Sequence, residues 1–529
     1  MSFLPARRAV PALVSVAALI ALALPGVASA KTEPNPDINA QCSGPAIQAE
    51  GSTFQGPAQF VLTGYEWETS ELLSTGYNHS TTNPLACAGA EGQGTRETPT
   101  VRYNQTNPLE RGSGSCLKSF GEGVKTFEEE KQEESGGVIY KDKYPRMSRF
   151  PFCGTDEAPS ATHKAEMETF AESPSPIETI PFGQGALAIV VHLPAGCTAS
   201  SEPTVKGTVR PSGRLSLTQS EIEEIYRGAL TKWSQLVGNS ANNKLTCTGG
   251  SGEEEEAIKP VVRRDKSGTT HIFKKFLEQV NETVKFSAET FGGKGEETRD
   301  WEEVAEGSEN QRWPTAAHVT KPAQNGNQGV VKTVGTTPST IGYADLAVAR
   351  EFEGGYFSKK CVAPAKAPEC GGENKKGEQN HEFWALVQNN PEKAEYADPS
   401  TDYDKYKKSN SNCTKTLYIA RTGEKVPPAS TLDDWSKVKG SNTSATYPIC
   451  GLTYDLAPQL YFPYLKRYGL SQEESKAIAT SAHDYLHWMV NAKAGGGGPT
   501  LKNTDYAKIS GTVQKEAELG AEEIGNTIP

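Results

Sequence analysis

Four short segments of the 529-residue sequence place glycine and small hydroxyl residues at predicted turns, where they could hold an oxyanion. These segments are 51–54 (GSTF), 112–115 (GSGS), 154–156 (GTD) and 263–270 (RRDKSGTT). A glycine allows the backbone to approach a ligand closely, hydroxyl groups donate hydrogen bonds, and an arginine offers a two-pronged donor. The last segment leads into a predicted helix over 272–280, and the unpaired N–H groups of a helix N-terminus attract anions. Together the four segments predict a site for a small oxyanion.

Three other segments predict the strands and helices that must position these turns. Residues 182–191 form a continuous apolar run of strand length, which is typical of a strand buried on both faces of a sheet. Residues 217–236 predict a helix, in which Thr218 is the N-cap and Glu221 completes a capping box. Residues 258–262 predict a short strand that leads into the arginine-bearing turn. Strands followed by helices at this spacing indicate an α/β fold.

The first thirty residues predict a secretory signal peptide. Arg7 and Arg8 precede an apolar stretch over 9–25, and the small residues at 28–30 (ASA) suit cleavage. The apolar stretch is short for a membrane span, which needs about 20 residues. We therefore expect an exported protein, periplasmic, extracellular or held at the cell surface, in which residues 31–45 form a flexible lead-in.

Ten cysteines all follow the predicted signal peptide, and an even number in an exported chain favours five disulfides. The sequence has no Cys-x-x-Cys pair, which disfavours a zinc ribbon or a thioredoxin-type redox site. Pairing in sequence order is the simplest arrangement, and the connectivity stays open at this stage. No metal and no cofactor are expected.

The composition excludes several classes of partner. A net charge of −11 argues against binding to nucleic acid or anionic lipid through bulk charge. The length is ample for two domains. Strongly polar segments at 121–148, 248–257, 286–326 and 364–412 predict solvated loops that need no partner to explain them.

The turn motifs occur within longer segments that carry a specific resemblance. In chain order these are GSTF (51–54), GSGSCLKSF (112–120), GTDEAP (154–159), IPFGQGALAIVVHLP (180–194), LTQSEIEEIYRGALTKW (217–233), VVRRDKSGTT (261–270), GNQGVVKTV (326–334) and TIGYAD (340–345). In these segments the chain resembles the phosphate-binding component of bacterial ABC phosphate importers, a type II periplasmic binding protein. The resemblance implies a two-lobed α/β fold with the ligand cleft between the lobes. Residues 46–184 and 341–529 would form lobe 1, and residues 185–340 would form lobe 2.

The resemblance also implies a function and a set of phosphate contacts. The protein would bind inorganic phosphate for delivery to ABC permease subunits, without being an enzyme. Lobe 1 would contribute Thr53, the N–H of Phe54, Ser113 and Asp156; lobe 2 would contribute Arg263, Ser267, Gly268 and Thr269, with Asp265 orienting Arg263. The sequence departs from the family at Cys116 and in the acidic insertion before Asp156. Since Cys116 and Cys153 lie within three residues of Ser113 and Asp156 respectively, we expect a disulfide between them.

The expected role of Asp156 agrees with elementary electrostatics. Phosphate near neutral pH still carries a proton, whereas sulfate does not. A buried, ionised carboxylate can accept the hydrogen bond of that proton, but it would face sulfate as an unpaired like charge. The simpler alternative for Asp156 is a structural turn residue or a helix N-cap.

Other functions remain open on particular motifs. Ser115 and Lys118 fit the Ser-x-x-Lys of serine acyl-enzyme hydrolases, and 240–242 and 266–268 loosely match the other two elements of that class. His483 and His487 have the i, i+4 spacing of a zinc site, but Asp484 replaces the glutamate of that motif, and an amphipathic helix is the better explanation. A secreted phosphatase, or a surface or adhesion protein built on the same scaffold, completes the alternatives.

Overall fold

A computed structural model of the chain describes most of the predicted elements. The described residues are 44–64, 76–79, 101–104, 112–120, 131–135, 138–142, 151–170, 175–209, 212–239, 243–247, 256–291, 298–305, 310–320, 323–351, 382–390, 392–401, 410–414, 418–419, 428–440, 446–466, 469–493 and 496–525. The predicted signal peptide and nearly all of the predicted lead-in lie outside them. Among the described helices, none combines the length and the apolar composition that crossing a bilayer requires.

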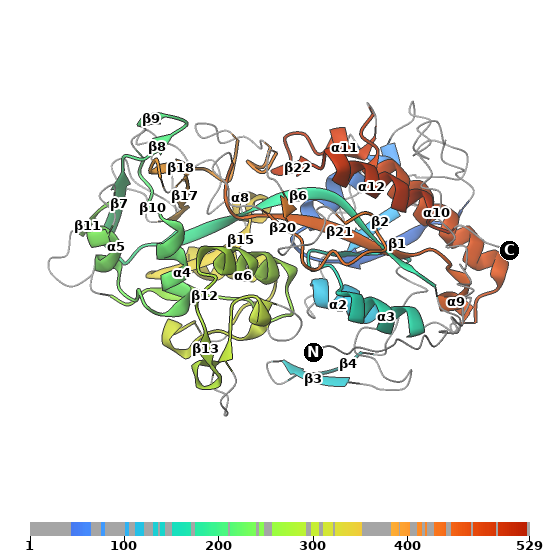
Figure 1. The fold of residues 1–529 in the computed structure, drawn as a ribbon, viewed down its shortest axis with the longest axis horizontal. Coiled ribbons are helices and arrows are strands. Elements are labelled where there is room, and N and C mark those ends of the chain that lie inside the picture. Colours follow the sequence, from blue (N-terminus) through green and yellow to red (C-terminus); the bar gives the residue numbers. More distant parts are fainter. Residues whose placement is uncertain are drawn as a thin grey trace, which may run out of the picture. The chain divides into compact units, whose positions relative to one another are not determined.

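The largest described sheet has nine strands and holds the turns of interest (Figure 1). Its strand order is β12-β15-β6-β21-β5-β1-β2, and β16 and β22 also pair with β6. The bounds are β1 (Ile47–Gly51), β2 (Val101–Asn104), β5 (Cys153–Thr155), β6 (Ile177–His192), β12 (Lys259–Val261), β15 (Thr340–Asp345), β16 (Glu382–Trp384), β21 (Cys450–Pro458) and β22 (Tyr506–Lys508). Parallel pairs (β1 with β2 and β5) occur beside antiparallel pairs (β21 with β5 and β6), so the sheet is mixed.

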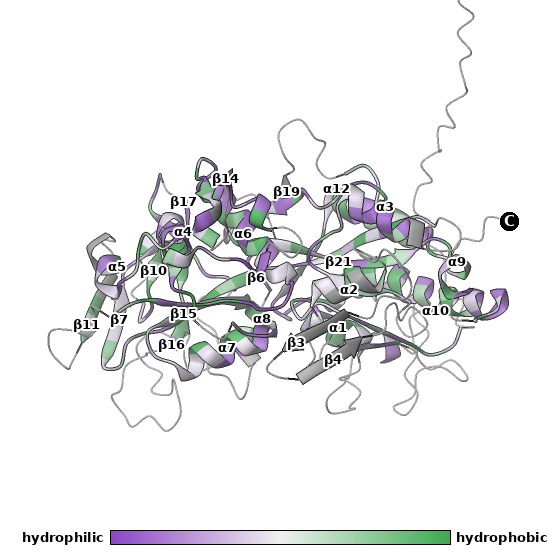
Figure 2. Ribbon diagram, turned by 90° about the horizontal axis from the view of Figure 1, so that it is seen from below, coloured by the Kyte–Doolittle hydropathy of each residue, from purple (hydrophilic) through white to green (hydrophobic). Residues whose placement is uncertain are grey.

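Strand β6 links the two parts of this sheet. Its residues 177–186 pair with β21, and its residues 187–192 pair with β15. Every residue of β6 except His192 is buried, and the strand runs through the interior beside β15 (Figure 2). A strand with paired neighbours on both edges and covered faces reads as a continuous apolar run, so the predicted strand over 182–191 is confirmed. The two-lobe boundaries predicted from the sequence stay a prediction.

Helices flank the sheet, and together with it they confirm the predicted α/β class. The helices are α1 (Gly56–Thr63), α2 (Ser113–Ser119), α3 (Ala161–Phe170), α4 (Gln219–Arg227), α5 (Trp233–Asn239), α6 (Gly268–Val280), α7 (Gly326–Thr336), α8 (Leu346–Glu351), α9 (Phe462–Leu465), α10 (Gln472–Val490), α11 (Gly497–Thr500) and α12 (Gly511–Glu522). Short 3-10 turns lie at Tyr77–His79, Ala288–Phe291, Glu303–Ala305 and Thr315–Ala317.

The remaining described strands form small sheets. They are β3 (Lys131–Ser135), β4 (Val138–Asp142), β7 (Cys197–Ser201), β8 (Thr204–Val205), β9 (Thr208–Val209), β10 (Ser216–Leu217), β11 (Asn243–Cys247), β13 (Phe286–Ser287), β14 (Thr298–Arg299), β17 (Leu386–Asn390), β18 (Glu395–Ala397), β19 (Tyr418–Ile419) and β20 (Lys439–Gly440). Five of them make one sheet in the order β10-β17-β18-β8-β9, and the others pair as two-stranded ribbons.

The helix predicted over 217–236 is two helices. Its start is as expected, because the Thr218 hydroxyl accepts the N–H of Glu221 (3.1 Å) and the Glu221 carboxylate accepts the N–H of Thr218 (2.7 Å). Helix α4 then ends at Gly228, which has φ +85° in the left-handed region and lies against the backbone of residue 316. A glycine in this conformation commonly ends a helix. The sequence composition does not distinguish a helix that ends at Gly228 from one that continues through it.

Parts of the polar segments 286–326 and 364–412 are buried, so the prediction of solvated loops is wrong there; in the second segment, residues 383–387 lie in or between β16 and β17 and are fully buried. Trp301 is fully buried and Trp313 nearly so, with their ring centroids 6.1 Å apart. Trp313 also lies 5.3 Å from the ring of Tyr226 on α4 and 4.4 Å from the amine of Lys274 on α6. Two large aromatic side chains bury enough apolar surface to fix a segment whose average composition is polar.

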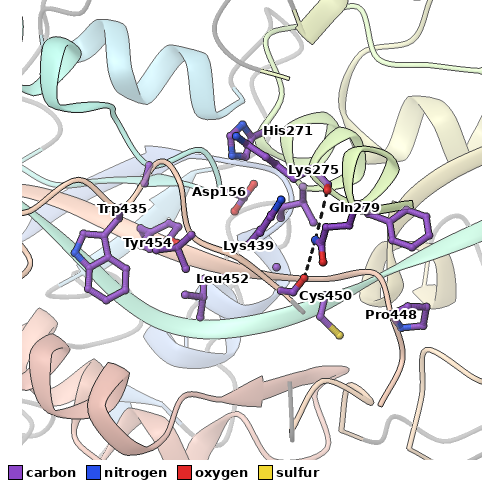
Figure 3. Close-up of a pocket in the computed structure, with 16 residues that line it drawn as sticks. Asp156, His271, Lys275, Gln279, Trp435, Lys439, Pro448, Cys450, Leu452 and Tyr454 are labelled. Carbon is purple, nitrogen blue, oxygen red and sulfur yellow. Dashed lines mark hydrogen bonds between the residues drawn. The ribbon is translucent and has the colours of Figure 1, made fainter. Parts of the chain in front are cut away.

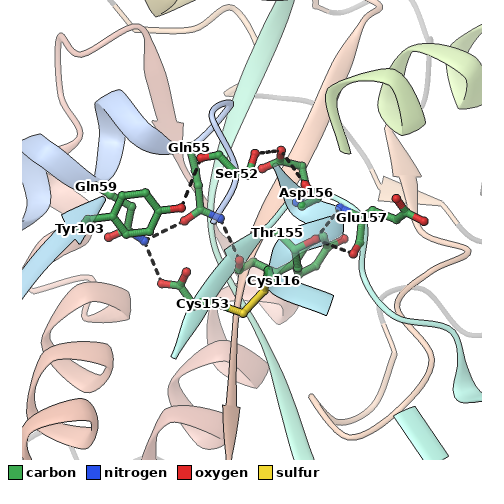
Figure 4. Close-up of a disulfide and its surroundings, with 12 residues drawn as sticks. Ser52, Gln55, Gln59, Tyr103, Cys116, Cys153, Thr155, Asp156 and Glu157 are labelled. Carbon is green, nitrogen blue, oxygen red and sulfur yellow. Dashed lines mark hydrogen bonds between the residues drawn. A yellow bond between two sulfur atoms is a disulfide. The ribbon is translucent and has the colours of Figure 1, made fainter. Parts of the chain in front are cut away.

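Three disulfides are described, and all three follow the sequence-order pairing: Cys116–Cys153, Cys197–Cys247 and Cys413–Cys450. The expected Cys116–Cys153 bridge is therefore confirmed; it ties α2 to β5, directly before Asp156 (Figure 4). The other four cysteines, at 42, 87, 361 and 370, lie outside the described residues.

The Cys116–Cys153 bridge generates a first prediction. It closes a loop with a sequence separation of 37 residues, so Cys116→Ser combined with Cys153→Ser should lower the free energy of unfolding by about 4 kcal/mol. Denaturant titration of the oxidised proteins measures this loss. Peptide mapping of the wild type without reductant should recover the linked 116 and 153 peptides, and free thiols at both positions in the exported protein would contradict the prediction.

Candidate anion-binding site

Two of the predicted turns meet at the same edge of the sheet. Strands β1 and β5 are parallel neighbours, so Ser52, after β1, and Asp156, after β5, leave the sheet side by side (Figure 4). A Cβ on Gly51 would lie 2.1 Å from the carbonyl oxygen of Gly154, and Gly51 has φ +149°. Only glycine fits such an approach, and the N–H of Ser52 closes the turn on the same carbonyl at 2.9 Å.

Asp156 is buried among hydroxyl groups. Its Oδ1 accepts the Thr453 hydroxyl at 2.7 Å, and its Oδ2 accepts the Ser52 hydroxyl and, at 3.3 Å, the Ser113 hydroxyl. Burial raises the pKa of Asp156 to about 6, while these three hydrogen bonds and the charge of Arg263 oppose the rise in pKa. Asp156 is therefore ionised above about pH 6 in spite of its burial.

Arg263 brings a full positive charge into the interior, with 1% of its surface exposed. Asp265 holds one side of the guanidinium, since Arg263 Nε donates to Oδ1 at 2.8 Å and Nη2 donates to Oδ2. The remaining nitrogen, Nη1, donates to the Thr269 hydroxyl at 3.3 Å and to Oδ1 of Asn327 at 3.4 Å. The two hydrogen bonds to Asp265 fix the plane of the guanidinium, as expected if Asp265 orients Arg263.

The N-terminus of α6 lies against both Asp156 and Ser113. Ser267 is the N-cap, and its hydroxyl accepts the N–H of Thr270 at 3.2 Å. A Cβ on Gly268 would lie 2.4 Å from Ser113 Oγ and 2.7 Å from the Cβ of Asp156, so this approach requires glycine. The N–H groups of Gly268 and Thr269 lie in the first turn, where no intrahelical carbonyl can accept from them.

The other predicted residues lie in the same cluster. Two groups expected to donate hydrogen bonds to the ligand, the Phe54 N–H and the Ser113 hydroxyl, donate to protein atoms in this structure. The Thr53 hydroxyl accepts from Asn327 Nδ2 at 3.4 Å. The N–H of Phe54, a predicted ligand donor, donates to the Ser52 hydroxyl at 3.0 Å. The Ser113 hydroxyl accepts the N–H of Asp156 at 3.0 Å and donates to its carboxylate. All nine residues predicted from the resemblance are thus close neighbours, and their roles stay predictions.

Three residues in this cluster were not predicted. Ser52 lies inside the GSTF segment and Asn327 inside the 326–334 segment, so their motifs had been noticed although their side chains had not been assigned. Thr453 lies 297 residues from Asp156 in the chain, on β21, within no motif of the sequence analysis. Only the pairing of β21 with β5 and β6 brings it to the site.

A separate pocket lies beside Asp156, between α6 and the start of β21 (Figure 3). Asp156 is the only predicted ligand residue in its lining, which also includes His271, Lys275, Trp435, Lys439 and Tyr454. Burial lowers the pKa of His271 to about 3, so this imidazole is neutral. Gln279 donates to the carbonyl of Gly440 at 2.9 Å across the pocket. The pocket adjoins the predicted site without being part of it.

The rival motifs gain no geometric support. The His483 and His487 rings stack 5.8 Å apart on α10, and His483 pairs with Asp484 at 3.4 Å. Within the described residues, no group of three or more His, Cys, Asp or Glu side chains is placed to hold a metal ion. The Ser115 side chain and residues 240–242, on which the acyl-enzyme alternative depends, lie outside the described part of the structure.

Comparisons with known proteins find phosphate-binding proteins among those similar to this chain. The chain is 26% identical over 200 residues to the phosphate-binding protein PstS of Xylella fastidiosa strain 9a5c, which covers 38% of this chain and 46% of that protein. It is 27% identical over 137 residues to PstS of Methanocaldococcus jannaschii, which covers 26% of this chain and 30% of that protein. The chain thus spans less than half the length of these curated relatives.

Solved structures and a family model complete the comparison. The high affinity periplasmic phosphate-binding protein PfluDING aligns over 89% of this chain and 92% of its own, at 16% identity and a TM-score of 0.46. The phosphate-binding protein from Stenotrophomonas maltophilia aligns over 89% and 93%, at 13% identity and a TM-score of 0.45. The model of the PBP superfamily domain matches residues 100–397, more than half of the sequence. The chain therefore belongs to the PBP superfamily.

Proposed function

We propose that this protein binds one inorganic phosphate ion at the cluster around Arg263 and Asp156, without turning it over. The observation that carries the proposal is the burial of both charges at the N-terminus of α6: Arg263 is 1% exposed and Asp156 is 2% exposed. An interior arginine whose third nitrogen has only long contacts, with the Thr269 hydroxyl and the Asn327 amide oxygen, suits an oxyanion. An interior carboxylate beside it suits an anion that still carries a proton.

We propose the remaining contacts residue by residue. The Thr53 and Ser113 hydroxyls and the N–H of Phe54 would bind from one lobe, and Ser267, Gly268 and Thr269 from the other, with Asp265 orienting the guanidinium of Arg263. The contacts that Ser113 and Phe54 make in this structure are with neighbouring protein groups, so each would exchange its partner when phosphate enters. The Ser113 hydroxyl can reorient at little cost, which allows this exchange at Ser113.

The proposed setting is transport. The predicted signal peptide and the disulfides support export, since disulfides persist in oxidising compartments. The curated relatives carry the name PstS, and delivery of phosphate to ABC permease subunits would be the corresponding role here.

Substitution of Arg263 tests the position of the site. Among the proposed ligands Arg263 carries the only full positive charge, so Arg263→Ala should weaken phosphate binding by roughly 100-fold, and Thr53→Ala by less than tenfold. The neighbouring Arg264 is the matched control; its Nε contacts Asn325 at 3.1 Å, and Arg264→Ala should leave affinity unchanged. Isothermal titration calorimetry on the phosphate-stripped proteins measures the phosphate affinity of all three variants. Small and equal losses of affinity in Arg263→Ala and Thr53→Ala would place the site elsewhere.

Selectivity against sulfate should depend on the charge of Asp156. Because burial raises its pKa to about 6, rejection of sulfate should be complete well above pH 6 and should be lost as the pH falls through 6, when Asp156 becomes protonated and can donate. Asp156→Asn should bind sulfate at least tenfold better relative to phosphate, with a ratio that no longer changes near pH 6. Competition binding between pH 5 and 8 measures this, and an Asn variant with the wild-type ratio would make Asp156 a structural turn residue.

Binding without turnover separates this proposal from a secreted phosphatase. The purified protein should release no phosphate from common monoesters above the buffer rate, while phosphate itself raises the melting temperature, as any ligand selective for the folded state does. Release of phosphate at a rate that Ser113→Ala abolishes would identify an enzyme instead.

A further inference from the structure

The carboxylate of Asp156 has two hydroxyl partners outside the set of predicted ligands. Thr453 donates to Oδ1 at 2.7 Å, and Ser52 donates to Oδ2 while accepting the N–H of Phe54 at 3.0 Å. Both residues are nearly fully buried, with 2% of Ser52 and none of Thr453 exposed. Both hydroxyls are thus shielded from solvent, as is that of Ser113.

The third partner of Asp156, Ser113, is held differently. Its hydroxyl donates to Oδ2 at 3.3 Å, a longer contact than that of Thr453. An ionised carboxylate offers about four acceptor positions. If the Ser113 hydroxyl turns to an incoming anion, Oδ2 regains one position for a donor, while Ser52 and Thr453 keep two others occupied.

A local irregularity in the sheet accompanies Thr453. In the pairing of β21 with β6, Thr453 lies opposite Gly183 but Tyr454 lies opposite Pro181, so β6 has one extra residue at this point. Such bulges re-aim side chains and are common next to functional sites. The bulge therefore lies directly where the sheet turns the Thr453 hydroxyl toward Asp156.

We propose that Ser52 and Thr453 are positioning residues that set the selectivity of the site, by holding Asp156 as a fixed, ionised acceptor with a place on Oδ2 for the proton of the ligand. On binding, the Ser113 hydroxyl donates to the anion, and the anion's own hydroxyl donates to Oδ2 in its place. A phosphate that carries a proton can donate that hydrogen bond to Oδ2. A fully deprotonated oxyanion has no proton to donate, so its negative oxygen would face the negative Oδ2. The inference rests on the proposed phosphate function and assigns its selectivity to residues outside the ligand set.

The charge state of Asp156 also depends on groups around it. Those that interact with Asp156 or line a pocket with it are Arg263 after β12, Asp455 and Tyr454 on β21, Asp345 on β15, Tyr506 on β22, Tyr103 on β2, His271 and Lys275 on α6, and Lys439 on β20. Burial raises the pKa of Asp455 to about 8, so Asp455 is protonated near neutral pH and adds no competing charge. Arg263 is the neighbour that favours ionised Asp156, in the same direction as the hydroxyls.

The test replaces the Thr453 hydroxyl by a methyl group and keeps the shape of the side chain. Thr453→Val should shrink the ratio of phosphate to sulfate affinity about tenfold near neutral pH, the loss expected for one hydrogen bond to a charged group, and should move the onset of sulfate binding to higher pH. Thr453→Ser should restore the wild-type ratio. Thr179→Val is the matched control, because Thr179 is a buried threonine of β6 whose hydroxyl has no partner among the described residues; its ratio should equal that of the wild type.

The outcomes separate this inference from the function on which it rests. Calorimetry with inorganic phosphate and with sulfate, at pH 6, 7 and 8, is run on all four proteins after a melting check. Wild-type protein that binds phosphate, together with an unchanged ratio in Thr453→Val, would overturn the inference alone. Wild-type protein that binds no phosphate would overturn the function as well. If Thr453→Val does not fold, Ser52→Ala takes its place, and an unchanged phosphate-to-sulfate ratio in that variant overturns the inference equally.

Discussion

A buried arginine charge constrains the arrangement of the whole site. Removing a guanidinium from water is costly unless its donors are paired, and Arg263 meets this requirement by placing two nitrogens on Asp265. The third nitrogen lies between the Thr269 hydroxyl and Asn327, at distances of 3.3 and 3.4 Å that are long for charged hydrogen bonds. The pairing with Asp265 stabilises the charge of Arg263. The weakly bonded Nη1 is the nitrogen from which we expect the guanidinium to bind an anion.

Glycine allows the other elements to reach that charge. Gly51 and Gly154 let the turns after β1 and β5 touch, and Gly268 lets the first turn of α6 contact Ser113 and Asp156. A Cβ at Gly51 would lie 2.1 Å from the carbonyl oxygen of Gly154, and one at Gly268 would lie 2.4 Å from Ser113 Oγ, both closer than such atoms can approach. The site therefore depends on backbone proximity as much as on charge, and these glycines belong to three of the four turn segments singled out in the sequence.

Much of the fold around the site could be predicted because the patterns that encode it are local in the sequence, whereas the residues of the cluster followed from the family resemblance. The capping box at Thr218, the buried run of β6 and the Arg263–Asp265 pair each involve residues within a few positions of one another or a uniform run. Thr453 could not be predicted, since its contact with Asp156 arises from strand order and from a bulge that no local pattern encodes. The break after α4 and the buried tryptophans of 286–326 were missed for a related reason: tertiary packing outweighed average composition.

The central claim is that a buried arginine and a buried, ionised aspartate together select a protonated oxyanion. Calorimetry on phosphate-stripped wild-type protein at pH 8, where Asp156 is ionised, tests this most directly with phosphate and sulfate titrated separately. The account predicts saturation by one phosphate per chain and sulfate binding weaker by at least about 100-fold, the equivalent of leaving one buried charge unpaired. Equal affinity for the two anions, or no heat of binding with phosphate, would contradict it.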